Sequence, residues 1–166
     1  MRNLSVVVSV SLAMCLAACG KSPEERAAGA ALSAMTGADV AVEKDGDKVT
    51  FGVGDGAMTI SSGDSARLPD DFPKQIFLPA DYSVDSVVDS AGFTMVALRT
   101  PGKVGDVAAR ASEHMLGHGW KQNMMAGDDS SRILSFQNSK TVALLSFDSH
   151  DDGGVLYSVQ LSPVSN

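Results

Sequence analysis

The last third of the chain reads ILSFQNSKTVALLSFDSHDDGGVLYSVQL from Ile133 to Leu161. Its three apolar runs, 133–136, 142–147 and 155–161, have the length and the β-branched and aromatic content of buried strands. Short polar segments rich in Asn, Ser, Asp and Gly separate the runs, and these residue types form tight turns. The stretch therefore predicts three consecutive antiparallel strands.

The residues upstream predict two more strands and a helix. Tyr82 to Asp89 and Phe93 to Arg99 flank a Ser90-Ala91-Gly92 turn. A stripe of apolar residues at helical spacing follows, and Gly117 and Gly119 end it. The stripe consists of Val104, Val107, Ala108, Ala111 and Met115. We expect residues 82–164 to form an antiparallel sheet of about five strands covered on one face by one helix.

Residues 38–66 predict a three-stranded β-meander, because apolar residues alternate with polar or small ones over 39–62. Asp45-Gly46 between the first two runs is a strong hairpin signal. The glycines of Gly52 to Gly56 are interpreted as turn residues. A phosphate-binding loop would also carry a lysine and be followed by a helix, and neither is present.

Two segments complete the expected α+β fold. Ser22, Pro23 and Glu25 occupy the N-cap, first-helical and capping-box positions of a helix within residues 19–37. Its narrow alanine-rich stripe favours packing on the domain over contact with a lipid surface. Residues 67–81 contain three prolines and predict a linker. Whether the meander packs against the 82–164 region is left open by the sequence.

The first eighteen residues predict a signal peptide, with Arg2 in the positive n-region and an apolar run of about 13 residues, too short to span a bilayer. Leu16, Ala17, Ala18 and Cys19 resemble the lipobox of bacterial lipoproteins. The resemblance implies cleavage before Cys19 and attachment of acyl chains to that residue, which would hold the chain at a membrane.

The same resemblance implies a location. Gly20 follows the cysteine where an aspartate tends to retain lipoproteins at the inner membrane of Gram-negative cells, so we expect the periplasmic face of the outer membrane. The outer face of a Gram-positive envelope is the alternative. The string from Leu68 to Pro73, with Leu78-Pro79 and Gly119-Trp120, also resembles small uncharacterised α+β envelope lipoproteins, which implies fold and compartment only.

Charge and cysteine content exclude several classes of protein. Cleavage after Ala18 leaves 148 residues with 12 basic against 20 acidic side chains, a formal charge of −8. No two basic residues are adjacent, so the chain lacks the basic footprint of a nucleic-acid-binding protein. Cys15 lies in the leader and Cys19 is lipidated, so the mature chain has no thiol for a disulfide or a nucleophile.

Candidate chemistry is limited to three places. His114 and His118 have the i, i+4 spacing of half a metal site, but no third ligand is evident, and a solvated helix face is the alternative. Met124 and Met125 add soft donors that copper would accept. The acidic stretch starting at Asp148 opens like a calcium loop, but position 159 is Val where such a loop carries Glu.

No catalytic constellation and no cofactor motif is present, so we expect a non-enzymatic protein. The sequence favours a lipid-anchored envelope module that binds a protein or a wall component through its sheet or loops. A lipoprotein that binds a metal or a small ligand is the alternative.

Overall fold

A computed structural model describes residues 22–36, 39–53, 56–151 and 153–164. Within these ranges the chain forms two helices, α1 (Pro23–Thr36) and α2 (Val104–Gly117), and a short 3-10 helix, η1 (Gly63–Ser65). Nine strands accompany them: β1 (Val40–Asp45), β2 (Lys48–Val53), β3 (Gly56–Ser62), β4 (Ser83–Ser90), β5 (Phe93–Thr100), β6 (Lys121–Gly127), β7 (Ser131–Gln137), β8 (Thr141–Ser149) and β9 (Val155–Pro163).

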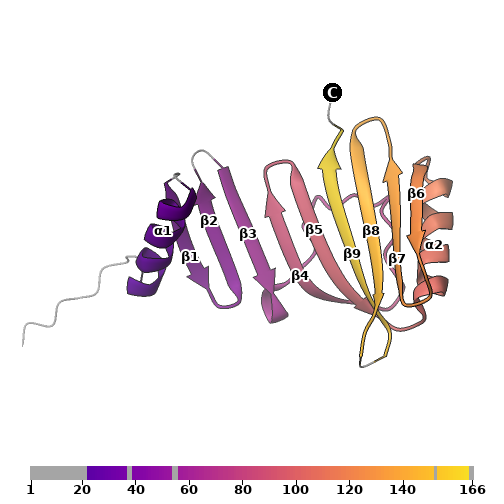
Figure 1. Ribbon diagram of the computed structural model, residues 1–166, viewed down its shortest axis with the longest axis horizontal. Helices are drawn as coiled ribbons and strands as arrows, with labels where there is room; N and C mark the ends of the chain where they lie inside the picture. The colour runs from indigo at the N-terminus through magenta and orange to yellow at the C-terminus, as the bar shows by residue number, and fades with distance from the viewer. Residues whose placement is uncertain (1–21, 37–38, 54–55, 152, 165–166) are drawn as a thin grey trace, which may run out of the picture.

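All nine strands belong to one antiparallel sheet with the order β1-β2-β3-β4-β5-β9-β8-β7-β6 (Figure 1). The expected meander is confirmed as β1 to β3. The meander joins the rest of the chain through β3, which pairs with β4 and makes the sheet continuous. The α+β class is confirmed in outline, with one nine-stranded sheet in place of three strands followed by about five.

The additional strand is β6. Its sequence, Lys-Gln-Asn-Met-Met-Ala-Gly, has neither β-branched residues nor an apolar alternation, so local preference alone does not predict a strand. It forms because α2 returns the chain beside β7. Gly127, with a φ of +109°, permits the tight β6–β7 hairpin, since a Cβ there would lie 2.1 Å from the Ser131 carbonyl oxygen.

The core lies between the sheet and α2, which contacts β6, β7 and β8. The five apolar residues predicted to face the sheet are the five that α2 buries, as the stripe indicates. Below the helix the rings of Phe147 and Tyr157 stack with centroids 4.7 Å apart. Trp120, directly after the helix, is also buried in this core.

The segment expected to be a linker is part of the core. Ile76 is 2% exposed and Phe77 is 8% exposed, and both belong to the same apolar cluster as α2. The Tyr157 hydroxyl donates a hydrogen bond to the Phe77 carbonyl oxygen at 3.1 Å. Figure 1 shows this segment crossing behind the sheet. The prediction of a linker at 67–81 was wrong, because it was based on the prolines and did not consider the apolar side chains between them.

The N-terminal helix α1 packs on β1, as its stripe predicts. Its capping box is present: the Ser22 N–H donates to the Glu25 carboxylate, and the Glu25 N–H donates to the Ser22 Oγ at 3.2 Å. A Cβ on Gly29 would lie 2.8 Å from the Val40 carbonyl oxygen, so helix and strand are in close contact. The expected C-cap, Gly37, lies outside the described residues.

Strand β1 is one edge of the sheet, and α1 occupies its outer backbone groups. The Val40 N–H donates to the Ser33 Oγ at 2.8 Å, and the Lys44 N–H donates to the Glu25 Oε1 at 2.6 Å. Backbone groups on an edge strand are open to pairing with another chain unless something covers them. The helix therefore caps this edge of the sheet.

The first hairpin of the meander forms at Asp45-Gly46, as predicted. Asp45 pairs with Lys48, and Gly46 has the positive φ (+58°) that such a turn requires. The second turn contains residues 54–55, which lie outside the described residues. Gly52 and Gly56 are strand residues on either side of it.

Candidate functional site

The sheet has one face covered by α2 and the 66–82 segment, and one face, here called the open face, that neither covers. At the β1 end of the open face, where α1 packs, Val40 and Val42 are buried. Strand pairing defines the open face, because directly paired residues lie on the same side of a sheet. One row of such partners crosses all nine strands: Lys44, Val49, Ile60, Val88, Met95, Gln160, Leu144, Ser135 and Met124.

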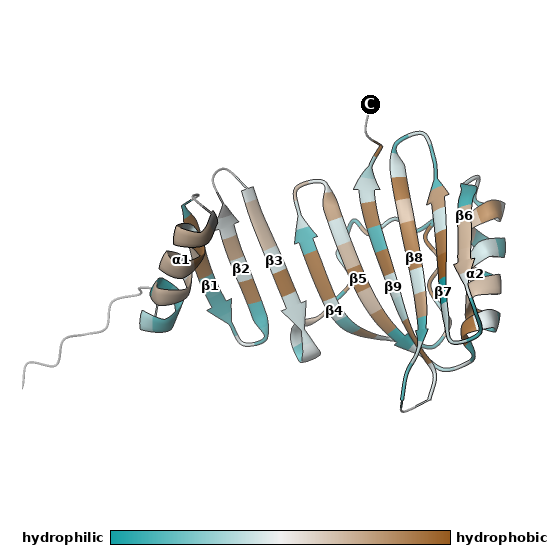
Figure 2. Ribbon diagram, in the orientation of Figure 1, coloured by the Kyte–Doolittle hydropathy of each residue, from teal (hydrophilic) through white to brown (hydrophobic). Residues whose placement is uncertain are grey.

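A second row beside it is made mostly of small side chains. It runs across seven strands through Ser62, Ser86, Ala97, Ser158, Ser146, Ile133 and Ala126. Most of the side chains in the two rows are half-buried, in contrast to those of the α2 face, where Leu145, Phe147 and Val159 are inaccessible to water. Figure 2 shows hydrophobic residues along the whole of β8 and β9, and the strand pairings place some of them, such as Leu144, on the open face.

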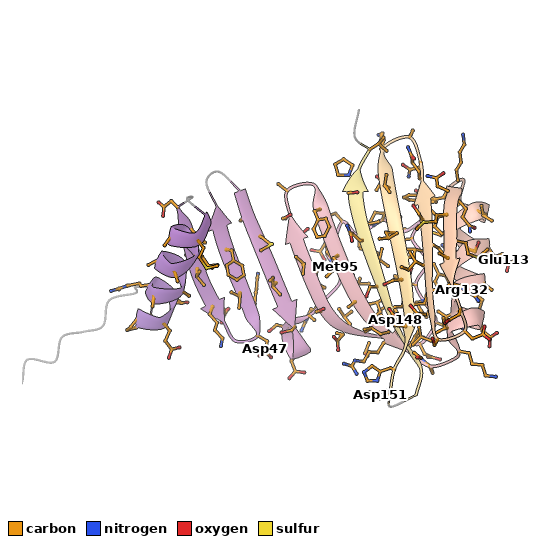
Figure 3. The ribbon with its side chains drawn as sticks, in the orientation of Figure 1. Asp47, Met95, Glu113, Arg132, Asp148 and Asp151 are labelled. Atoms are coloured by element: carbon orange, nitrogen blue, oxygen red, sulfur yellow. The ribbon has the colours of Figure 1, made fainter. Side chains whose placement is uncertain are left out.

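The charges of the open face gather at one end of it. Arg99 is bonded to the Asp85 carboxylate at 2.7 Å, and its Nη1 lies 2.8 Å from the His150 Nε2. The Asp148 carboxylate accepts a hydrogen bond from the Ser131 Oγ at 2.7 Å. Figure 3 labels Met95 and Asp148 on this face. The charged end is thus internally paired, and the remaining charges on the strands of this face are Lys44 on β1 and Lys121, which pairs with Gln137, on β6.

The structure brings His114 and His118 together but does not arrange them as metal ligands. Their rings stack with centroids 4.1 Å apart and planes 24° apart. The lone pairs of imidazole lie in the ring plane, so stacked rings do not direct two nitrogens at one ion. The Nδ1 of His118 lies 2.8 Å from the His114 carbonyl oxygen, and Phe77 contacts the His114 ring edge-to-face. Helix packing accounts for this pair.

The pKa of His114 is lowered from its usual 6.5, first by burial and then by the neighbouring His118, while a hydrogen bond with the Gln75 backbone opposes the shift. The neutral form is therefore favoured in the folded state. The unfolded chain takes up a proton as the pH falls through 6.5 and the folded chain resists it, so this residue lowers stability on acidification.

Replacing His114 by glutamine is expected to reduce the loss of stability in acid. The melting temperature of the variant, relative to that of the unaltered chain, should rise as the pH is lowered from 7.5 to 5. Thermal unfolding followed by circular dichroism at several pH values measures this difference. Parallel melting-temperature curves for the two chains would contradict the assignment.

The other sequence-predicted positions are separated by the fold. Met124 pairs with Ser135 and Met125 with Leu134, so the two methionines project from opposite faces of the sheet and cannot share a copper ion. Asp148 lies within β8 and is bonded to Ser131, and residue 152 lies outside the described residues. Leu16, Ala17, Ala18 and Cys19 also lie outside them.

The described ranges contain no membrane-spanning helix and no cluster of metal ligands. Neither α1 nor α2 is long and apolar enough to cross a bilayer. Among the same residues, no group of three or more His, Cys, Asp or Glu side chains is placed to hold a metal ion.

The string from Leu68 to Pro73, which resembles a segment of envelope lipoproteins, lines a cavity that could not be predicted from the sequence. Pro69, Asp71, Phe72 and Pro73 form one wall of a space of about 610 Å³, opposite the β4–β5 turn and Lys140. The open face could not be predicted from the sequence either, because its residues form rows only when the order of all nine strands is known. The sequence contained one indication of this face. An antiparallel sheet covered by one helix has a second face, and that face must be polar, be covered by another segment or bind another molecule.

No protein-family model, curated protein or solved structure matches this chain.

Proposed function

We propose that this protein is a lipid-anchored bacterial envelope lipoprotein whose open face binds another envelope protein, without catalysis. The leader, with its lipobox at Leu16 to Cys19, supports the anchor, and Gly20 supports the periplasmic face of the outer membrane. The open face, with its rows of half-buried side chains, carries the binding part of the proposal.

The composition of the open face indicates the chemistry of its partner. The two rows combine aliphatic and methionine side chains with serine hydroxyls and one glutamine amide. Burying the part of this surface between Lys44 and Lys121 removes apolar area from water without stripping water from unpaired charges, since Arg99 and Asp85 already neutralise each other. The partner that fits is a neutral protein surface with aliphatic side chains and a few hydrogen-bonding groups.

The contrast with the whole chain supports this choice. The chain carries a formal charge of −7, yet the acidic residues are largely absent from the two rows of the open face. The charged residues on the rest of the surface favour solubility, whereas a neutral patch surrounded by charged residues favours specific binding of another protein.

The absence of catalysis in the proposal rests on where the histidines lie. A serine nucleophile needs a base within hydrogen-bonding reach. His114 is on α2 and His118 directly follows its last residue, on the opposite side of the sheet from the serines of the open face. His150 is engaged with Arg99 at the charged end.

A photo-crosslinking amino acid at position 158 tests the proposal. Ser158 lies in the middle of the small-residue row, and Ala109, exposed on α2, is the matched control position. In intact cells, the probe at 158 is expected to give a discrete adduct with one envelope protein, and the probe at 109 is expected to give no adduct with that protein.

A second substitution makes the result specific. Ile133 is 36% exposed on the same row, so Ile133→Asp places a charge on the open face without opening the core. It should abolish the adduct while the melting temperature of the protein changes little. A lack of adduct at 158, equal adducts at both positions, or an adduct that survives Ile133→Asp would overturn the proposed binding face.

A further inference from the structure

The two edges of the sheet differ. On β1 the outer backbone groups of Val40 and Lys44 are bonded to α1. On the other side, β6 has β7 as its only strand neighbour in the described part of the chain. Its pairing with β7 shifts register around Asn123 and is regular from Met124 to Gly127. A strand left without a neighbour offers its backbone groups for pairing with another strand.

The side chains of β6 add an apolar contact surface to this edge. Met124 is 45% exposed on the open face, and Met125 is 64% exposed on the α2 face. Beside Met125 a groove of about 440 Å³ lies between α2 and the β6–β7 hairpin, with Leu116 and Leu134 among its lining residues. Glu113 and Arg132, labelled in Figure 3, lie on α2 and β7 and also line it. An exposed methionine thus stands next to an apolar groove.

The charges at the two ends of β6 have opposite signs. Lys121 begins the strand, and Asp128 and Asp129 follow its last residue. The side chain of Asp129 is fully exposed and lies 3.7 Å from the Arg132 guanidinium, and Asp128 accepts hydrogen bonds from Ser130 and Ser131 that lower the pKa of its carboxyl. An antiparallel strand centred on Met124 or Met125 of an identical copy would place Lys121 opposite residues 127–129, where these carboxylates are.

We infer that β6 is a dimerisation edge, at which β6 of a second copy of this chain pairs antiparallel to it. A two-fold interface uses the same patch on both copies, so each patch must complement itself. This one does so in three respects: the free backbone edge, the opposite charges at its two ends, and a methionine beside a groove that receives the methionine of the other copy.

These features favour a second copy over a foreign peptide strand. A peptide of another protein requires only the backbone edge, and it gives no reason for opposite charges at the two ends or for a methionine and a groove on one patch. The dimer edge shares Met124 with the open face, whereas the crosslinking position Ser158 lies three strands away on β9. The mass of the chain and the adduct at position 158 therefore test the two surfaces by separate measurements.

Sedimentation equilibrium of the full chain in density-matched detergent tests the inference. The unaltered chain is expected to have twice the mass of one copy at micromolar concentration. Met124→Lys should raise the dissociation constant about tenfold or more, because two lysines would face each other near the symmetry axis. Met35→Lys is the matched control, since Met35 is 84% exposed on α1 at the opposite end of the sheet, and it should leave the mass unchanged.

A charge exchange provides the second readout. Lys121→Glu alone should raise the dissociation constant about fivefold, because like charges would then meet at both ends of the paired strands. Lys121→Glu combined with Asp129→Lys should restore it. A monomeric mass for the unaltered chain, a dimer insensitive to Met124→Lys, or a monomer that binds a foreign strand at β6 would overturn the inference.

Discussion

The Ile76→Ala variant is expected to lose about 2–5 kcal/mol of its free energy of unfolding, the usual loss when a large aliphatic side chain is removed from a packed core. Ile76 is 2% exposed and belongs to the cluster that joins α2 to the sheet. The neighbouring Phe77 is fixed to Tyr157 by a hydrogen bond, so the segment cannot easily collapse into the space left by the side chain. Urea unfolding followed by circular dichroism measures the loss.

Leu116→Ala is the matched control for this prediction. Leu116 is a residue of similar size on α2 but is 51% exposed, so its truncation should change the free energy of unfolding by less than about 1 kcal/mol. Equal effects of the two substitutions would mean that residues 67–81 are a detached linker, as their prolines alone predict.

The largest expected effect on location is that of Cys19→Ala. If Cys19 carries acyl chains, its loss should abolish the incorporation of alkyne-tagged palmitate completely. Each buried methylene contributes about 0.8 kcal/mol to membrane attachment. The acidic chain offers no basic patch to replace that attachment. Metabolic labelling followed by gel fluorescence gives the result directly.

The chain itself supplies the control for this experiment. Cys15 lies four residues earlier, in the segment that the lipobox marks for removal, so Cys15→Ala should keep the full label. The intact mass of the purified protein should correspond to a chain that starts at Cys19 and carries acyl groups. Label in the Cys19→Ala variant, or a mature chain that starts elsewhere, would contradict the lipoprotein assignment.

Elements with a strong local period were predictable from sequence. The stripe from Val104 to Met115 gave the buried face of α2 residue by residue, and Asp45-Gly46 gave the first hairpin. Ser22 and Glu25 gave the start of α1. In each case the physical cause acts within a few residues, through helical spacing, a turn conformation or a cap, so one stretch of sequence contains it.

Features that depend on distant contacts were not predictable. β6 is a strand because β7 lies beside it, and Ile76 is buried because α2 and β9 leave a space for it. The open face needed the whole strand order, since Met95 and Leu144 become members of one row only through Gln160 on β9. The stacking of His114 on His118 likewise depends on packing, because i, i+4 spacing permits both a metal site and a ring contact.

The cap that α1 places on β1 limits how far this protein can associate through its sheet. Edge-to-edge growth into a fibre needs two reactive edges on every molecule, one to receive a strand and one to offer the next. With Ser33 and Glu25 bonded to the backbone of β1, one of these edges is already satisfied. Whatever strand joins β6, α1 blocks the opposite edge of the sheet, so association through β6 stops at a closed complex and does not continue into a fibre.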